Sequence, residues 1–496
     1  MNIPTAEKLS DLEKGPEPHP VSSLQDSTGT GTGPSPIIHV KAFEEGDPEN
    51  PHNFPLSRKL YHTIVLVLFC FTCSMSSAMY TPALGDIEEK YNVTREVALM
   101  STGVLLMGFI IGPIIWSAVN EAFGRWYSWT IGFFLFQLFQ IPTGVDPNFR
   151  TLLVGRFFQG LFGVSTLVTF GASMSDIWGY KTRGFSAAIA VFSIFAAPAL
   201  GPFIGSLLVE FAGFGYISWL VMMLGAILLV LNMFVKETAA PVIFHRKAIR
   251  MRKEGLNARA PIEEVPPTLM NLATKYCIRP FIMLVEDKAL AFLCVYAGIS
   301  YGLLYTILIA LPVTFAEYRH FSFIPTYLPS IAVLVGVVIT SLHLCVTNGA
   351  YIRAAEKAGV LMLPDQRLKP MMCGAIFLPI GLFIFGWTAP FTNVHWMGPI
   401  VGAAIVGYAT SIIFIAAIMY MIESYGHFAS SAFAANAIIR SMVAVLFLLV
   451  FSRMVEAMTL QGAFSFFGGI SILIAPGPFI LFKYGKVWRS LSKWTP

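Results

Sequence analysis

The sequence predicts an all-α membrane protein with twelve transmembrane helices in two six-helix bundles, and three observations support this fold class. Of the 496 residues, 55% are hydrophobic and only 12% are charged, and the mean hydropathy is +0.68. Soluble proteins carry about 25% charged residues. The apolar residues gather in runs of about 20, long enough for a helix rising about 1.5 Å per residue to cross about 30 Å of hydrocarbon. A polar, basic stretch divides the runs into six and six.

The first predicted bundle covers residues 57–236. Its apolar runs are separated by charged or turn-forming residues, which mark the ends of helices. The six spans are predicted at residues 60–83, 97–119, 126–145, 149–174, 184–209 and 214–236.

The second predicted bundle covers residues 288–484. It follows a polar central loop at 237–287 and precedes a short cytosolic tail at 485–496. Its six spans are predicted at residues 288–314, 327–348, 370–388, 396–421, 428–451 and 462–482.

Residues 1–56 differ in composition from the rest of the chain. They are rich in Pro, Gly, Ser, Thr and Glu, and such a segment cannot bury enough apolar surface to fold alone. They also lack the basic patch, apolar run and cleavage site of a removable signal peptide. We therefore predict a disordered cytosolic tail.

The distribution of basic residues predicts the orientation of the chain. The formal net charge is +5, and the basic residues concentrate in short loops and in FHRKAIRMRKEG (244–255). Cytoplasmic loops of membrane proteins are enriched in Lys and Arg, so the central loop and both termini are predicted to be cytosolic. This pattern explains the charge without a nucleic-acid partner. The sequon Asn92-Val93-Thr94 then lies on the first outer loop, where Asn92 is a candidate glycosylation site.

Several kinds of chemistry are not indicated by the sequence. Cys70 and Cys73 form a CxxC pattern, but both lie within the first span, where packing is the simpler interpretation. The chain has no GxxxxGK[ST] phosphate loop, no zinc-type Cys/His cluster and no GxSxG turn. We expect neither an enzyme nor a resident metal or cofactor.

Two arginines lie inside predicted spans. A mid-membrane arginine costs about 2.5–3.5 kcal/mol on insertion scales, so each should face protein or water. Arg156 has Gln159 three residues later on the same helical face, and Arg440 has Asn436 four residues earlier. For Arg156, a purely structural role with bonds to backbone carbonyls is the alternative. For Arg440, a structural or gating role is favoured.

Eight stretches of the chain carry a family resemblance. They are DPENPHNFPLSRK (47–59), GPIIWSAVNEAFGRW (112–126), GRFFQG (155–160), APALGPFIG (197–205), KETAAPVIFHRKAIRMRKE (236–254), RPFIMLVED (279–287), YGLLY (301–305) and SSAFAANAIIRS (430–441). With these motifs in this order, the chain resembles the major facilitator superfamily, specifically the fungal twelve-span drug:proton antiporter branch.

The resemblance implies roles for the motif residues. Glu121 and Arg125 would form a charged latch near a neighbouring helix end, with Gly124 permitting a tight turn. Arg156 matches an arginine that is linked to proton transfer in the family. The stretch containing Gly201, Pro202 and Gly205 resembles the motif that accompanies ion-exchanging exporters and is thought to prevent leak; glycines and prolines also occur in membrane helices of other functions.

The resemblance also implies a cavity between the bundles, lined mainly by helices 1, 4, 7 and 10. An aromatic cavity with few polar anchors suits amphipathic organic molecules. Each of these residues, taken alone, is also compatible with ordinary packing. The candidate substrate-contacting residues are Ser77, Tyr80, Tyr301, Tyr305, Tyr408, Phe414 and Asn436.

These observations lead to a functional expectation. The chain should be a secondary transporter that exports a small lipophilic or amphipathic compound in exchange for protons, by alternating access. A specific importer, or an organic-anion carrier in which Arg156 and Arg440 bind a carboxylate, is the alternative. No Asp or Glu lies in the middle of a cavity helix, so the expected proton coupling depends on the resemblance. We expect a monomer in the plasma membrane of a fungal cell.

Overall fold

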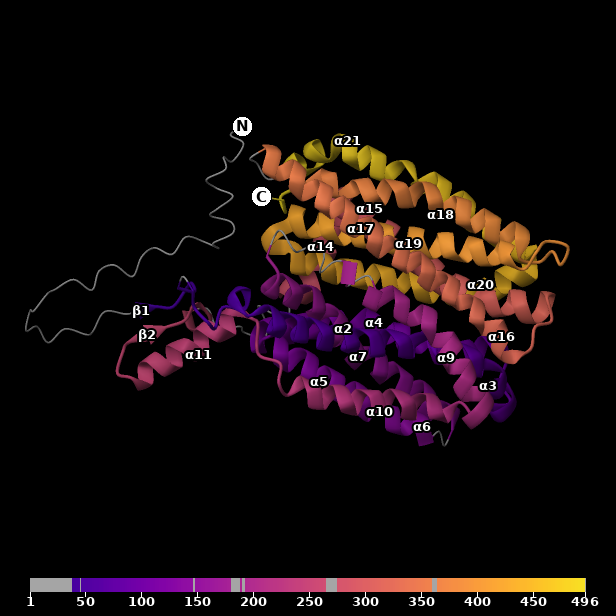
Figure 1. Cartoon of the computed structure of the whole chain (residues 1–496), viewed down its shortest axis with the longest axis horizontal. Coiled ribbons are helices and arrows are strands. Elements are labelled where there is room, and N and C mark those ends of the chain that lie inside the picture. The colour runs from indigo at the N-terminus through magenta and orange to yellow at the C-terminus, as the bar shows by residue number, and fades with distance from the viewer. Residues whose placement is uncertain are drawn as a thin grey trace, which may run out of the picture.

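The computed structural model describes residues 38–44, 46–145, 148–179, 188–189, 192–264, 274–358 and 364–495. Long helices dominate these residues and run roughly parallel in two halves, one built from each half of the chain (Figure 1). The two halves of the chain therefore form the two predicted bundles.

The first half contains the helices before the central loop. Helix α2 (Leu56–Ala78) continues through η2 (Thr81–Ala83) into α3 (Leu84–Tyr91), so that one apolar segment of 36 residues begins the bundle. The following helices are α4 (Arg95–Phe123), α5 (Arg125–Leu138), α6 (Gln140–Val145), α7 (Phe149–Ile177), the π-helical turn η3 (Phe192–Ala196), α9 (Ala197–Ala212) and α10 (Gly215–Asn232).

The second half begins near Thr274, after the central loop. Its elements are η4 (Thr274–Ile278), α14 (Arg279–Glu286), α15 (Lys288–Pro312), η5 (Val313–Tyr318), α16 (Phe323–Tyr327), η6 (Leu328–Ser330), α17 (Ile331–Ala358), η7 (Pro364–Leu368), α18 (Lys369–Thr388), α19 (Met397–Tyr425), η8 (Gly426–Phe428), α20 (Ala429–Ile474) and α21 (Pro476–Leu491).

Ten helical segments of the described residues are long and apolar enough to cross a membrane. Two local features reconcile this number with twelve predicted spans. The predicted third span is divided between α5 and α6, so neither piece is long enough alone. The predicted eleventh and twelfth spans fall in one continuous segment, which breaks at Met458 and Thr459, where φ is −133° and +64°. The start of the predicted fifth span lies outside the described residues.

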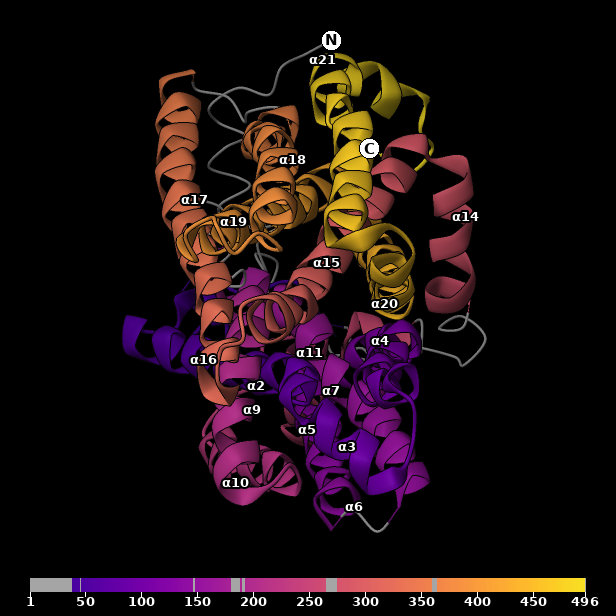
Figure 2. The same ribbon diagram turned by 90° about the vertical axis from the view of Figure 1, so that its right-hand side faces the viewer.

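Small residues allow close helix contacts within and between the halves. A Cβ on Gly108 of α4 would meet the backbone of α7 at Phe157 and Leu161. Association of helices in lipid depends on such close packing, because lipid tails are as apolar as the helices themselves. Between the halves, α4 packs against α20, and α9 packs against α16 and α17 (Figure 2).

A small unit beyond the ends of the membrane helices, made of residues 38–54 and 240–264, corrects the predicted disordered tail in part. Strand β1 (Ile38–His39) pairs in parallel with β2 (Ala258–Arg259), and β2 follows α11 (Ala240–Lys253) and precedes α12 (Pro261–Glu264). The unit has its own apolar core, which includes Val40, Phe244, Ala248, Ala258 and Ala260. Residues 1–37 and 45 of the predicted tail lie outside the described residues.

An ion pair attaches the N-terminal segment to α11. Lys247 donates a hydrogen bond to the Asp47 carboxylate at 2.9 Å. Burial acts to raise the pKa of Asp47, but the bonds from Lys247 and the Glu49 amide outweigh it, so the pKa lies below its ordinary value of 3.8. The order of residues 38–54 thus arises from a partner about 200 residues away, which a local reading of composition does not detect.

Candidate functional site

Arg156 of α7 lies at the centre of the first half and is fully buried. Its Nε donates to the Ser101 carbonyl of α4 at 2.8 Å, and its Nη1 donates to the Ser76 carbonyl of α2 at 3.1 Å. Nη1 also donates to Gln159 Oε1 at 3.1 Å, and the guanidinium lies 4.3 Å from the centroid of the Tyr80 ring. The guanidinium therefore connects three helices, as the cost of burying an arginine requires.

Gln159 extends this arrangement toward α6 and α10. Its Nε2 donates to Thr143 Oγ1 at 2.7 Å and to the Phe139 carbonyl at 2.9 Å. Thr143 shares a hydrogen bond of 2.8 Å with the Ser218 hydroxyl, and Ser218 shares one of 2.9 Å with the Tyr80 hydroxyl. A buried network of this kind holds its side chains in one arrangement, because each broken bond leaves a polar group unsatisfied.

A hydrogen bond crosses from the first half to the second at this level. The hydroxyls of Ser77 on α2 and Tyr305 on α15 are 2.8 Å apart. The Tyr305 hydroxyl also lies 3.4 Å from the hydroxyl of Tyr301, which is one helical turn away on α15. Because Arg156 Nη2 donates to the Ser77 carbonyl at 3.4 Å, the network of the first half reaches the tyrosines of the second.

An aromatic cluster joins the halves beside these tyrosines. Phe195, in the π-helical turn of the first half, has its ring centroid 5.9 Å from that of Tyr301 and 5.1 Å from that of Phe414 on α19. The Arg440 guanidinium of α20 lies 5.1 Å from the Tyr301 centroid and 5.2 Å from the Phe414 centroid. Each half therefore contributes one buried guanidinium stacked on an aromatic ring.

The central site is closed to solvent in this structure. Ser77, Tyr80, Arg156 and Tyr305 are at most 2% exposed, and Arg440 is 6% exposed. Within the described ranges, no carboxylate forms an ion pair with either arginine. The two positive charges are balanced only by carbonyls, hydroxyls and aromatic rings, so the site favours groups that are apolar, aromatic or negatively charged.

Two of the expected substrate-contacting residues lie apart from the central hydroxyl and aromatic contacts. Asn436 is buried on α20, four residues before Arg440, and its Nδ2 has no hydrogen-bond partner among the residues that the structure describes. Tyr408 is half-buried on α19, and its hydroxyl lies 2.8 Å from His343 Nδ1 on α17. Tyr408 therefore belongs to a polar contact within the second half.

Gly201, Pro202 and Gly205 belong to α9, in the predicted fifth span, and this helix lies against α2. A Cβ on Gly201 would approach the Met75 carbonyl oxygen to 2.9 Å, and a Cβ on Gly205 would overlap the Met79 carbonyl. Pro202 lies between them inside α9. The two glycines are thus required where α9 meets the backbone of α2, beside the residues that hold Arg156.

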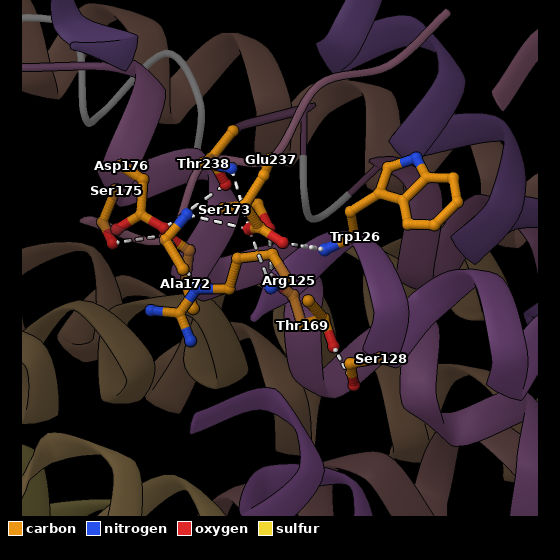
Figure 3. Close-up of polar contacts among 11 residues, drawn as sticks. Arg125, Trp126, Ser128, Thr169, Ala172, Ser173, Ser175, Asp176, Glu237 and Thr238 are labelled. Atoms are coloured by element: carbon orange, nitrogen blue, oxygen red, sulfur yellow. Dashed lines mark hydrogen bonds and ion pairs between the residues drawn. The ribbon is translucent and has the colours of Figure 1, made fainter. Parts of the chain in front are cut away.

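The region of the predicted latch, between α4 and α5, contains an ion pair of Arg125 with the end of another helix. The Arg125 side chain pairs with Asp176 at the end of α7, with Nε 3.0 Å from Oδ2, while Glu121 is exposed near the end of α4. Glu237 accepts from the backbone amides of Arg125 and Trp126 at 2.9 and 3.1 Å (Figure 3). A carboxylate at a helix N-terminus satisfies amides that have no partner within the helix.

Gly124 explains how Glu237 reaches α5. Its φ is +97°, a value that glycine adopts without strain, and a Cβ there would overlap the Glu237 carboxylate. In the sequence, Glu237 is distinguished only as one residue of the similar stretch 236–254. Its position directly after the sixth span, in the sequence KET, is the signal that could have identified it.

A corresponding charge pair is present in the second half. Arg367, between α17 and α18, donates from Nε to the Glu423 carboxylate of α19 at 2.7 Å. Arg125 and Arg367 thus follow the second and eighth spans, and Asp176 and Glu423 end the fourth and tenth. This repetition is what two bundles related by a pseudo-twofold axis would produce.

The fold and the enclosed interface define a helical, multi-pass membrane protein of the transporter class. Residues 66–448 match the family model described as Major Facilitator Superfamily. The chain belongs to this superfamily; it is a secondary transporter and not an enzyme.

Curated relatives are transporters of fungi. The chain is 34% identical to the "Ascochitine biosynthesis cluster MFS transporter" of Didymella fabae, covering 96% of this chain and 93% of the relative. It is 32% identical to the "Citrinin biosynthesis cluster MFS transporter mrr1" of Monascus ruber, covering 91% of each. It is also 32% identical to the "Major facilitator superfamily multidrug transporter FLU1" of Candida albicans, covering 92% and 76%.

Solved structures share the fold at low sequence identity. The proton:xylose symporter XylE, bound to 6-bromo-6-deoxy-D-glucose, superimposes with a TM-score of 0.64 at 14% identity, covering 87% of this chain and 96% of that one. The human organic anion transporter MFSD10 superimposes with a TM-score of 0.58 at 14% identity, covering 86% and 100%. These likenesses concern the fold alone.

Proposed function

We propose that this transporter exports a small lipophilic or amphipathic organic compound in exchange for protons. The observation that carries the proposal is the enclosed core at the interface of the halves, where hydroxyls, aromatic rings and two guanidinium groups meet. A compound with a flat apolar body and one polar group would match this core, because aromatic surfaces take the body and hydroxyls orient the polar group. The relatives include biosynthesis-cluster transporters and a multidrug transporter, which supports the same substrate class.

In this proposal the contacts between halves open and close around the substrate. The Ser77–Tyr305 hydrogen bond and the packing of Phe195 on Tyr301 and Phe414 would break on the side from which substrate enters. On the outer side, Arg95 of α4 and Glu317 of η5 form an exposed ion pair of 2.8 Å between the halves. Exposed pairs contribute only about 0–1 kcal/mol, so this contact can open readily.

Residues of the central network would have separate roles. Arg156 would couple proton movement to substrate binding, with Gln159 holding its guanidinium in place. Gly201, Pro202 and Gly205 would keep α9 against α2 and so prevent leak. Ser77, Tyr80, Tyr301, Tyr305 and Phe414 would contact substrate, and the protein would act as a monomer in the fungal plasma membrane.

The test is metabolite profiling of fungal cells that express the protein or lack it. Extracts of cells and medium are compared with and without a protonophore that collapses the proton gradient. We expect at least one organic compound to rise in the medium and fall in the cells only when the protein and the gradient are both present. Accumulation inside the cells would show import instead, and insensitivity to the protonophore would exclude proton coupling.

An organic-anion carrier is the second candidate, and one observation favours it. Arg440 Nε is buried and has no hydrogen-bond partner within the described part of the chain, so it has a donor available for a carboxylate. If the substrate is an anion, Arg440→Gln should weaken transport of that compound and spare a neutral analogue. Equal loss of both would exclude direct recognition of the carboxylate by Arg440.

A further inference from the structure

A polar groove lies on the cytosolic face of the first half, outside the central site. Its volume is about 630 Å³, and it runs between the N-terminal segment, the start of α5 and α11. The lining side chains include Trp126 and Tyr127 from α5, Lys236 after α10, and Arg246 and Arg250 from α11. Nothing in the transport cycle proposed above uses this groove.

The charges of the groove are unevenly compensated. Glu49 is bound by Arg250, with Nη2 2.5 and 2.6 Å from its two carboxylate oxygens. Both oxygens of Glu237 accept from backbone amides, as described above. Lys236 and Arg246 are exposed, and among the described carboxylates none forms an ion pair with either. The groove therefore presents two uncompensated cations to an incoming anionic group.

A second, apolar groove lies further along α5, where this helix is beside α10. Its volume is about 410 Å³, and no polar surface lines it. It is formed by residues 130–135 of α5 and residues 229–233 at the end of α10, including Ile131, Phe134, Val230 and Met233. Ile131 lies one helical turn from Tyr127, about 6 Å along the axis, so the apolar groove begins where the polar one ends.

The membrane-facing character of this surface completes the pattern. Ile131, Phe134, Val230 and Met233 are 46%, 55%, 59% and 75% exposed, as expected for side chains in contact with lipid. Tyr127, at the boundary between the two grooves, is 41% exposed. Trp and Tyr are enriched at the level of lipid head groups, where one edge of the ring is apolar and the other is hydrated.

We propose that the two grooves together bind one anionic phospholipid of the cytosolic leaflet. Lys236 and Arg246 would bind the phosphate, Trp126 and Tyr127 would lie at the head-group level, and the groove between α5 and α10 would take an acyl chain. Basic sites beside membrane helices recognise anionic head groups in this way. A soluble phosphate compound or a phosphorylated peptide would use the cations but would leave the apolar groove empty. A phospholipid is therefore the occupant that fits both the polar and the apolar groove.

The test measures lipid binding by the full-length protein, purified in detergent and titrated with phosphatidylinositol or phosphatidylcholine during native mass spectrometry. The wild type should bind phosphatidylinositol more tightly than phosphatidylcholine. Lys236→Gln with Arg246→Gln should reduce phosphatidylinositol affinity about 30-fold, which corresponds to about 1 kcal/mol for each cation. Lys253→Gln with Lys486→Gln, two exposed cations outside the grooves, is the matched control and should leave the affinity unchanged.

A second variant tests the apolar groove independently of charge. Val230→Trp should fill the groove and weaken phosphatidylinositol binding, while both cations stay in place. Equal phosphatidylinositol affinity in the wild type and both groove variants would overturn the proposal. So would tight binding of inositol phosphate or of a phosphorylated peptide that Val230→Trp leaves unchanged, since the site would then recognise phosphate without lipid.

Discussion

Replacement of Arg156 by alanine is the most direct test of the central network. The substitution removes three hydrogen bonds of 3.1 Å or less, to the Ser101 and Ser76 carbonyls and to Gln159. Bonds to a charged group are each worth about 1.5–3 kcal/mol, so their loss costs about 4.5–9 kcal/mol. Removing the buried guanidinium avoids a burial cost of about 2.5–3.5 kcal/mol, so the net destabilisation is about 1–6.5 kcal/mol.

The matched control is Arg319→Ala. Arg319 also donates three hydrogen bonds to carbonyls, those of Val394, Thr388 and Phe391, at 3.0–3.1 Å. It lies after η5, away from the central site. Thermal unfolding of both purified variants measures the loss of stability. Transport is then measured at equal amounts of folded protein in the membrane, with the compound identified by metabolite profiling.

We expect Arg156→Ala to abolish transport and Arg319→Ala to retain it. The network around Arg156 connects three helices and reaches the second half through Ser77, whereas Arg319 binds only carbonyls at the end of α18 and in the segment that follows it. Full transport by folded Arg156→Ala would refute the role of Arg156. An equal loss in folded Arg319→Ala would show that the assay reports general stability.

Four further outcomes are expected. Glu237→Ala should lower the free energy of unfolding by about 1–3 kcal/mol, because two amides at the start of α5 lose their acceptor. Glu237→Gln should lower it less, and thermal unfolding of the purified variants measures both losses. Gly205→Ala should destabilise by about 1–3 kcal/mol, because its Cβ overlaps a carbonyl of α2, whereas Gly171→Ala, with open space around its Cβ, should not. Asp47→Asn should speed limited proteolysis of the N-terminal segment about fivefold, the equivalent of about 1 kcal/mol. Because the pKa of Asp47 is lowered, the wild-type ion pair with Lys247 should persist at pH 5 and weaken only as the pH falls below 3.8. Thr94→Ala should abolish a glycosidase-sensitive mass shift that Thr94→Ser retains, and the absence of any shift in the wild type would contradict glycosylation of the first outer loop.

The spans were predictable because hydrophobic length is a local property of the sequence. The burial of Arg156 could also be inferred, since an arginine within an apolar run must find protein or water. Its partners could not be inferred, because the carbonyls of Ser76 and Ser101 belong to the backbone, and any residue there would provide the same acceptor. Which carbonyls are close enough depends on how three helices pack.

Contacts between distant segments were the main omission. Glu237 lies 112 residues from Arg125, and Lys247 lies 200 residues from Asp47. In each case a single acidic or basic residue in a polar segment has many possible partners, and only the folded arrangement selects one. Phe195 was missed for a related reason, since one phenylalanine among 42 carries no local signal of its position between the halves.

The small unit formed by residues 38–54 and 240–264 can report on the transport cycle. It is anchored to the first half, where η1 (Pro51–Asn53) contacts α7. It also projects beyond the ends of the membrane helices (Figure 1). When the first half rotates, the tip of this projecting unit moves further than the ends of the membrane helices do. The distance between a fluorophore at Lys253 and a second one at Lys486 on α21 should therefore change during each turnover.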